Sequence, residues 1–391
     1  CRNLTESTRV LHIFPLWVCA LTSEKFSTFV RFKAMATIIR TEEFLERGKS
    51  LPIIDVRSPG EYEHAHIPGA LNLPLFTDEE RAETGTIYKK KGQVPAIQRG
   101  LELAGPKLAD FTRFALSLKG REILIHCWRG GMRSSSMAWL LERVGLECYL
   151  LEGGYKAYRN YVLSCFEIPF RGVLLGGFTG SGKSEVLQKL YEAGEQVIDL
   201  EQLANHKGSA FGSLGQLPQP SKEQFENELC NILLPLDRER IVWIEDESRN
   251  IGKITIPEEF WKKMRQFPLV KLDTDREIRL QRLIRDYTCF SQDELSASIS
   301  KIEKRLGYDR CKMALNAVAE GNTAEAVRIC LDYYDSSYSD QLTARYGKEL
   351  AGIRSVKSDS LDTSAVIKEL IIAGKEKNNQ RIEKFYINGN K

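Results

Sequence analysis

The sequence predicts two consecutive α/β domains, each built around a parallel β-sheet. Its 391 residues exceed what one ordinary hydrophobic core requires. From Thr37 onward, short apolar runs alternate with helical stretches, which is the pattern of strands joined by crossover helices. Two of these runs end in glycine-rich turns that precede a helix, at residues 127–134 and 177–184. We therefore expect one reactive or binding loop in each domain.

The composition is that of a soluble globular protein, with 42% hydrophobic residues, 28% charged residues and a formal charge of +3. This charge neither demands nor excludes a nucleic acid partner. The nine cysteines form no C-x-x-C pair, so we expect neither a zinc site nor a disulfide scaffold, and we expect a cytoplasmic protein. No run reaches the roughly 18 apolar residues of a membrane span, so we expect no membrane partner.

The two ends of the chain differ from its middle. Residues 1–34 begin with Cys and match a secretory signal poorly, whereas Met35 opens a better domain start. We predict a disordered extension over residues 1–34, and the sequence does not decide whether it belongs to the protein. Residues 374–391 are rich in Lys and Asn, and we predict a flexible tail there.

A buried strand is followed by DVRSPGEYEHAHIPGALNLP, residues 55–74, which resembles the entry motif of rhodanese domains. We interpret Asp55 and Arg57, at the end of the strand, as a structural ion pair rather than as catalytic groups. His64 and His66 are two residues apart, which on a helix places them on different faces. A metal site made by this pair is therefore not expected.

A polar and basic segment follows at residues 77–100 and includes three consecutive lysines at 89–91. One interpretation is a helical insertion that is solvated on all sides. The other is a patch that faces RNA phosphates. Both interpretations remain open.

Cys127 follows a predicted strand at residues 122–126 and opens a turn that leads into a helix. The helix dipole, the backbone N–H groups of the turn, and Arg129 and Arg133 are placed to stabilise a thiolate. We therefore predict that Cys127 is a nucleophile and that the two arginines bind an oxyanion. The other loop residues that we expect to form this site are Trp128, Gly130, Gly131, Met132 and Ser134.

The Cys-x5-Arg spacing from Cys127 to Arg133 is compatible with two chemistries. It matches protein phosphatase loops, including those built on the rhodanese fold, whereas sulfur-transferring rhodaneses usually have one residue fewer. Because loop length sets the radius of the anion pocket, the spacing favours phosphate or another anion larger than sulfur.

The second turn, GFTGSGKS, follows an apolar run at residues 173–176. A strand that leads into G-x-x-x-x-G-K-[ST] predicts a phosphate-binding loop, in which backbone N–H groups surround an anion. Lys183 supplies positive charge, and Ser184 begins the following helix. The other residues expected to bind phosphate are Gly177, Thr179, Gly180, Ser181 and Gly182.

Acidic residues follow two further predicted strands of the second domain, namely Asp199, Glu201, Glu245 and Glu247. The carboxyl ends of parallel strands meet at one edge of a sheet, so we expect these residues to face the phosphate loop. Asp199 and Glu201 either hold Mg²⁺ or a ribose, or only cap the next helix. His206 and Arg249, in the loops beyond, are further candidates, and we assign no metal ligand from the sequence.

Four arginines recur every three residues on a predicted helix, at Arg276, Arg279, Arg282 and Arg285. This spacing forms a basic stripe that is suited to closing over phosphate or lining a groove for RNA. The alternative is a solvated face whose charges pair with Asp275, Glu277 and Asp286.

Three motifs occur in the order HCWRGGMRS, LEGGYKAYR and GFTGSGKS, at residues 126–134, 151–159 and 177–184. In this combination the chain resembles the tRNA 2-selenouridine synthase family over about residues 35–373. The resemblance implies a rhodanese-like domain at residues 35–166. It further implies a P-loop NTPase-like domain with a helical extension at residues 167–373.

The resemblance implies a transferase that replaces sulfur by selenium in 2-thiouridine at the tRNA wobble position. It implies selenophosphate as the donor and S-geranyl-2-thiouridine, formed with geranyl diphosphate, as an intermediate. On this view Cys127 carries the selenium or sulfur, while Arg129 and Arg133 bind the oxyanion of the donor. No tightly bound cofactor is implied, and the expected partners are tRNA and an enzyme that supplies selenophosphate.

Several alternatives remain open. Lys183 and Ser184 are compatible with geranyl diphosphate, but also with ATP or GTP and Mg²⁺. The alternative function is a Cys-dependent phosphatase or sulfurtransferase fused to a nucleotide-binding domain. The sequence does not indicate the oligomeric state or the surface that contacts tRNA.

Overall fold

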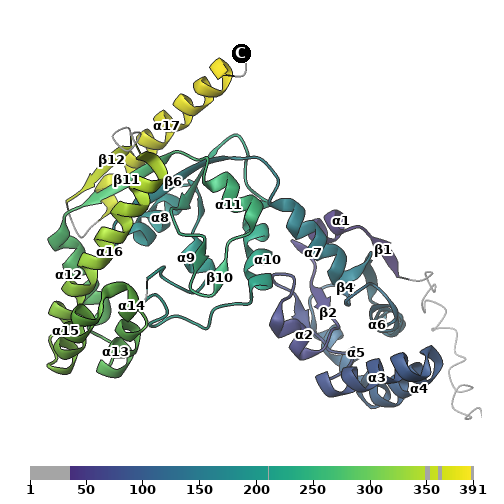
Figure 1. Cartoon of the computed structure of the whole chain (residues 1–391). Coiled ribbons are helices and arrows are strands. Elements are labelled where there is room, and N and C mark those ends of the chain that lie inside the picture. Colours follow the sequence, from purple (N-terminus) through teal and green to yellow (C-terminus); the bar gives the residue numbers. More distant parts are fainter. Residues whose placement is uncertain (1–35, 210, 348–352, 360–362, 389–391) are drawn as a thin grey trace, which may run out of the picture.

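The computed structural model describes residues 36–209, 211–347, 353–359 and 363–388. Two parallel sheets form the centres of two adjoining domains (Figure 1), which confirms the predicted α/β class. The extension predicted at residues 1–34 lies outside the described residues. Among the helices that the structure describes, none combines the length and the apolar character needed to cross a membrane.

The first domain contains a five-stranded parallel sheet in the order β1-β5-β4-β2-β3. Its strands are β1 (Thr37–Ile39), β2 (Ile53–Asp55), β3 (Leu71–Asn72), β4 (Glu122–His126) and β5 (Glu147–Leu151). Every residue of the central strand β4 except Glu122 is buried, which is typical of a parallel sheet covered on both faces. The cysteine loop therefore starts at the middle of the carboxyl edge of this sheet.

The helices of the first domain are α1 (Thr41–Gly48), α2 (Pro59–His64), α3 (Asp78–Lys91), α4 (Gln93–Ala104), α5 (Leu108–Ser117), α6 (Met132–Arg143) and α7 (Gly154–Cys165). The basic segment at residues 77–100 forms α3 and α4, which pack against each other. α3 buries no residue, and its three consecutive lysines are exposed. These features agree with a solvated helical insertion, and contact with RNA stays a prediction.

The second domain contains a five-stranded parallel sheet in the order β12-β11-β6-β8-β7. Its strands are β6 (Arg171–Gly177), β7 (Gln196–Ile198), β8 (Ile241–Glu245), β11 (Leu269–Thr274) and β12 (Arg354–Ser358). A short hairpin, β9 (Asn250–Ile251) and β10 (Ile254–Thr255), follows β8. Because β6 is central and next to β8, the phosphate loop and the acidic residues emerge at the same edge.

The helices of this domain are α8 (Lys183–Glu192), α9 (Leu200–Leu203), α10 (Lys222–Leu233), α11 (Glu258–Met264), α12 (Arg276–Tyr287) and α17 (Ile367–Asn388). The predicted extension comprises α13 (Gln292–Ser300), α14 (Glu303–Leu306), α15 (Tyr308–Ala319) and α16 (Thr323–Tyr346). With α12 they surround an apolar core of their own, which includes Leu295, Val327 and Leu331. The predicted tail is helical as far as the structure describes it.

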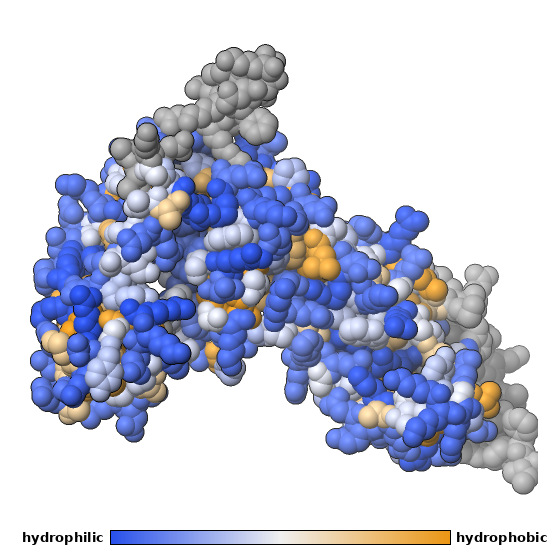
Figure 2. Space-filling model, in the orientation of Figure 1, coloured by the Kyte–Doolittle hydropathy of each residue, from blue (hydrophilic) through white to orange (hydrophobic). Residues whose placement is uncertain are grey.

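The two domains meet where α7 packs against α10 (Figure 1). The Tyr155 hydroxyl donates to Glu223 at 2.9 Å and accepts from the Asn227 amide at 2.9 Å. Arg159 forms an ion pair with Glu226. One cluster of buried apolar side chains continues from the first domain into the second. The face of the molecule seen in Figure 2 is mostly hydrophilic.

Candidate functional site

Cys127 lies at the carboxyl end of β4 and begins the loop that leads into α6. Its side chain is buried, and its Sγ lies 3.2 Å from the Ser134 hydroxyl oxygen. The Ser134 hydroxyl also lies 3.0 Å from the carbonyl oxygen of Gly131, to which it donates. Trp128 and Met132 are exposed around the loop. Among the predicted loop side chains, Ser134 therefore contacts the thiol directly.

Close backbone contacts with the segment after β5 hold the cysteine loop. The N–H groups of Tyr155 and Lys156 donate to the carbonyls of Cys127 and Trp128 at 2.8 and 3.0 Å. A Cβ atom on Gly154 would lie 2.4 Å from the Cys127 carbonyl oxygen, so no larger residue fits there. The motifs HCWRGGMRS and LEGGYKAYR are therefore parts of one structure, although nothing in the sequence indicated this contact.

The two arginines of the loop have different environments. Arg133 donates to Glu61 at 2.8 Å, while Arg129 is exposed. Burial alone would raise the pKa of Glu61, but the hydrogen bond and charge of Arg133 outweigh burial and lower this pKa. Glu61 is thus ionised at neutral pH and is a poor proton donor, which disfavours the phosphatase alternative. Sequence reasoning missed Glu61 because only the fold brings α2 to the cysteine loop.

Asp55 and Arg57 form the predicted structural ion pair, with an N–O distance of 2.6 Å and almost no exposure. The Arg57 guanidinium stacks on the Tyr155 ring, 3.7 Å from its centre. Burial alone would raise the pKa of Asp55, but His126 and the hydrogen bonds from Arg57 lower it. Burial lowers the pKa of His126, which keeps its ring neutral at pH 7. These groups support the loop from within the domain.

The phosphate loop between β6 and α8 has the geometry that its sequence predicts. Lys183 turns back over the loop, with its Nζ 3.4 Å from the Gly177 carbonyl oxygen. Burial alone would lower the pKa of Lys183, but Glu245 and the neighbouring carboxylates raise it, so the amine stays charged. The Ser181 hydroxyl is buried, and it has no hydrogen-bond partner among the residues that the structure describes. Tyr338, which sequence reasoning did not place here, accepts from the Gly177 N–H at 2.9 Å.

A cavity of about 710 Å³ opens above the phosphate loop. It is lined by residues of the loop, of α12 and α16, and of the segment after β8. Its charged lining includes Lys183, Glu201, Glu247, Arg249 and Arg285. Its aromatic and apolar lining includes Trp261, Leu283, Tyr287, Tyr333, Tyr334, Tyr338 and Leu342. The cavity thus combines a site for an anion with an apolar wall.

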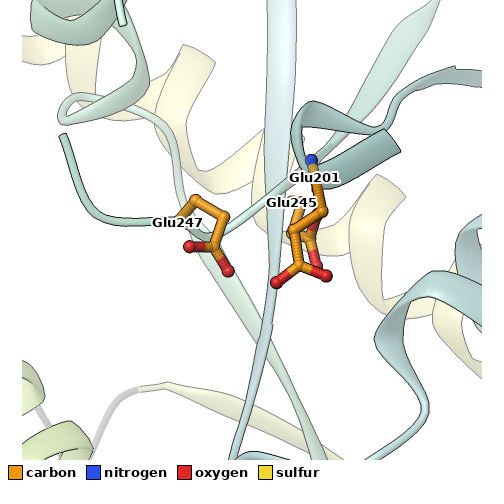
Figure 3. Close-up of side chains that lie close together, drawn as sticks. All are labelled: Glu201, Glu245 and Glu247. Carbon is orange, nitrogen blue, oxygen red and sulfur yellow. Dashed lines mark hydrogen bonds between the residues drawn. The ribbon is translucent and has the colours of Figure 1, made fainter. Parts of the chain in front are cut away.

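Glu201, Glu245 and Glu247 form a cluster, here called the carboxylate trio, at the carboxyl ends of β7 and β8 (Figure 3). One oxygen of each lies within 4.8 Å of the others. Burial raises the pKa of all three, and the negative charges of their neighbours raise those of Glu201 and Glu245 further. The fold therefore brings together three acids that the sequence placed at this edge.

The other predicted residues near the cavity have structural partners. Asp199 accepts from the Gln202 N–H at 2.8 Å, as expected for a residue that caps α9. Arg249 pairs with Glu258. His206 is the exception, because it is buried and its Nδ1 atom finds no hydrogen-bond partner in the described part of the chain.

The four arginines of α12 do not form the uniform stripe that their spacing suggested. Arg279 makes a double hydrogen bond to Asp335 on α16, and Arg282 donates to the Gly180 carbonyl at 2.8 Å. Arg276 pairs with Asp332, and Arg285 lies near Asp286 at the surface. Arg279 and Arg282 are buried because α12 packs directly on the phosphate loop. Sequence spacing alone does not reveal such packing.

Models of known protein families match both domains of the chain. A model of the rhodanese-like domain matches residues 40–161, and a model of the tRNA 2-selenouridine synthase AAA domain matches residues 170–355. The tRNA 2-selenouridine synthase of Shewanella denitrificans is 36% identical over 354 residues, which cover 80% of this chain and 94% of the relative. The chain belongs to the tRNA 2-selenouridine synthase family.

Another similar protein is the tRNA 2-selenouridine synthase of Bdellovibrio bacteriovorus, which is 39% identical over 267 residues. The matched residues cover 65% of this chain and 67% of the relative. A solved N-terminal domain from Clostridium difficile 630 is 46% identical, with a TM-score of 0.30, and covers 32% of this chain and 99% of its own. Membership of the tRNA 2-selenouridine synthase family identifies the chain as an enzyme.

Proposed function

We propose that this enzyme replaces sulfur by selenium in 2-thiouridine at the wobble position of tRNA. Selenophosphate is the proposed donor, and geranyl diphosphate first converts the sulfur into S-geranyl-2-thiouridine. The names of the relatives support action on tRNA. The anion-binding loops in both domains support two successive steps. tRNA and an enzyme that supplies selenophosphate are the proposed partners.

The observation that carries the proposal is that charged groups and apolar side chains line the same cavity. Lys183 and the backbone of the phosphate loop suit a diphosphate. The same cavity is also lined by aromatic and apolar side chains, on which an apolar chain gains free energy by leaving water, about 0.8 kcal/mol per buried CH₂. A lipid diphosphate uses both surfaces. We therefore favour geranyl diphosphate over ATP or GTP as the ligand.

The geranyl step follows from this placement. The sulfur of 2-thiouridine attacks the first carbon of geranyl diphosphate, a C–S bond forms, the C–O bond breaks, and the uridine N3 proton is released. The leaving diphosphate gains negative charge as the C–O bond breaks. Lys183 and the loop N–H groups stabilise that charge.

The selenium step is assigned to the cysteine loop. Cys127, held beside Ser134 at the base of the loop, is the proposed nucleophile. Its thiolate attacks the phosphorus of selenophosphate, an S–P bond forms and the P–Se bond breaks. The released selenide then forms a C–Se bond at C2 of S-geranyl-2-thiouridine, the C–S bond breaks and geranylthiol leaves, while water hydrolyses the S–P bond and releases phosphate. The exposed Arg129 and the N–H groups of Gly130 and Gly131 are the proposed donors to the phosphate oxygens of selenophosphate. The length of the Cys-x5-Arg loop suits an anion with phosphate geometry.

The test uses purified protein and tRNA that contains 2-thiouridine, followed by mass spectrometry of the nucleosides. We expect S-geranyl-2-thiouridine with geranyl diphosphate alone and 2-selenouridine once selenophosphate is added. Calorimetric titrations with geranyl diphosphate, inorganic diphosphate, ATP and GTP identify the ligand of the cavity. We expect geranyl diphosphate to bind at least about tenfold more tightly than inorganic diphosphate, because only the former reaches the apolar wall. Tight nucleotide binding without geranyl diphosphate binding would overturn this assignment.

A further inference from the structure

The carboxylate trio has the donor atoms of a cation site. Glu201 comes from α9, Glu245 is the last residue of β8, and Glu247 lies just beyond it (Figure 3). Hard divalent cations such as Mg²⁺ and Mn²⁺ prefer oxygen ligands, and they usually keep several waters besides one or two carboxylates. The trio supplies such oxygen donors, one from each glutamate, within 4.8 Å of one another.

Glu245 supplies a second observation that points to a ligand. Its side chain is fully buried, and its Oε2 atom accepts from the Glu201 N–H at 3.3 Å. Its Oε1 atom is also buried, and among the described residues no hydrogen-bond partner of this atom is found. A buried carboxylate oxygen without a partner is costly, and native proteins rarely contain one without a ligand, water or proton to satisfy it.

Gly208 supplies a third observation. The loop after α9 passes close over the trio, and Gly208 lies there with a φ of 65°. A Cβ atom at this position would lie 2.4 Å from Glu201 Oε1 and 3.0 Å from each carboxylate oxygen of Glu247. A side chain at this position would therefore collide with the carboxylate oxygens of both glutamates.

The position of the trio explains why a cation, rather than protons alone, would balance the charge of its carboxylates. Glu201 and Glu247 line the same cavity as Lys183 and Ser184. Lys183 supplies one positive charge, whereas a diphosphate and the trio, when ionised, bring several negative charges into this space. Without further positive charge the trio would repel the anion, and a divalent cation between them turns this repulsion into attraction.

We propose that Glu201, Glu245 and Glu247 bind one small divalent cation, of the Mg²⁺ or Mn²⁺ type, which also contacts a diphosphate held by the phosphate loop. Binding of the cation stands on the trio itself. Its contact with a diphosphate rests on the proposed function of the cavity. The cation would add a positive charge at the leaving diphosphate, beyond the charge of Lys183.

Electron paramagnetic resonance of Mn²⁺ tests the first part on the full chain without any tRNA. We expect about one tightly bound Mn²⁺ per chain and at least tenfold weaker binding in the variants Glu201→Gln and Glu247→Gln. Glu239→Gln is the matched control, because Glu239 is exposed and pairs with Arg171 away from the trio. Circular dichroism checks that each variant is folded. No tight Mn²⁺ in the unmodified protein, or unchanged affinity in folded Glu201→Gln and Glu247→Gln variants, overturns the proposal.

Titration with inorganic diphosphate tests the second part. We expect Mg²⁺ to tighten diphosphate binding at least tenfold in the unmodified protein and in Glu239→Gln, but not in Glu247→Gln. Equal diphosphate affinity with and without Mg²⁺ would contradict the contact between cation and diphosphate, even if Mn²⁺ binds at the trio. Neither titration measures tRNA modification, so failure of the proposed function would be seen separately, in the nucleoside analysis.

Discussion

Arg133 of the cysteine loop donates a hydrogen bond to Glu61 of α2 at 2.8 Å. Glu61 belongs to the motif at residues 55–74, so this motif contacts the reactive loop. Glu61 is only 13% exposed, and its lowered pKa keeps it ionised. We predict that Glu61→Gln lowers the free energy of unfolding by about 1.5–3 kcal/mol at pH 7, because the Glu61 carboxylate accepts hydrogen bonds from Arg133 and Ser58 and pairs with Arg81. Chemical denaturation measures this difference. An unchanged stability would show that the pair does not anchor Arg133.

The buried pair of Asp55 and Arg57 gives a larger prediction. Replacing Asp55 by Asn leaves the Arg57 charge buried without its partner, and we expect a loss of about 3–5 kcal/mol. Because the folded pKa of Asp55 is lowered, its stabilising effect is present above about pH 4, the ordinary value for Asp, and is lost as the pH falls further. The destabilisation should therefore be large at pH 7 and shrink in acid.

Hydrogen exchange measured by mass spectrometry on peptides from β4 reports the stability of this domain. Asp110→Asn is the control, because the pair of Asp110 and Arg113 is exposed and should contribute less than about 1 kcal/mol. Equal effects of Asp55→Asn and Asp110→Asn would contradict the structural role of the buried pair.

Gly154→Ala tests whether the cysteine loop depends on the glycine pair after β5. The new Cβ would collide with the Cys127 carbonyl, so we expect selenium incorporation to fall at least about a hundredfold, as it does for comparable displacements in enzyme sites. Gly145→Ala is a matched control, since Gly145 also has a positive φ but has open space around it. Both variants are assayed by nucleoside mass spectrometry with pre-geranylated tRNA. Similar losses in both would point to backbone strain rather than to the contact with the loop.

Arg282→Ala tests the contact between α12 and the phosphate loop. Arg282 donates to the Gly180 carbonyl, and its charge lies beside the site where the diphosphate is expected. We predict an approximately tenfold increase in the dissociation constant of geranyl diphosphate, measured by calorimetry. Arg328→Ala, which removes an exposed partner of Glu325, should change it less than about twofold. Equal affinities for the Arg282 and Arg328 variants would remove Arg282 from the binding site.

The elements that the sequence predicted best are those with strong local patterns. The strand before Cys127 and the strand before GFTGSGKS are apolar runs that end in turns, and parallel order then places their loops at a sheet edge. Asp55 and Arg57 were also predictable, because they are close in the chain. The contacts of Glu61, Gly154 and Tyr338 were not, because each joins segments far apart in sequence and leaves no local periodicity.

The arginines of α12 also show what sequence spacing does not predict. Their spacing of three correctly indicated one helix, but spacing does not state which face packs. Arg279 and Arg282 are buried against the phosphate loop, whereas Arg276 and Arg285 pair with acids at the surface. Tertiary packing decides which of four similar residues contacts the site.

We propose that the phosphate-loop domain performs the geranyl step and that the cysteine loop performs the selenium step. The most direct test of this assignment uses tRNA that already carries S-geranyl-2-thiouridine, together with selenophosphate. We predict that Lys183→Ala still forms 2-selenouridine from this substrate, because its defect lies in the earlier geranyl step. Cys127→Ala should form none, although it should still geranylate 2-thiouridine in a separate assay. Nucleoside mass spectrometry measures both products. Selenium incorporation by Cys127→Ala at the unmodified rate, or its loss in Lys183→Ala with this substrate, would contradict the assignment of one step to each domain.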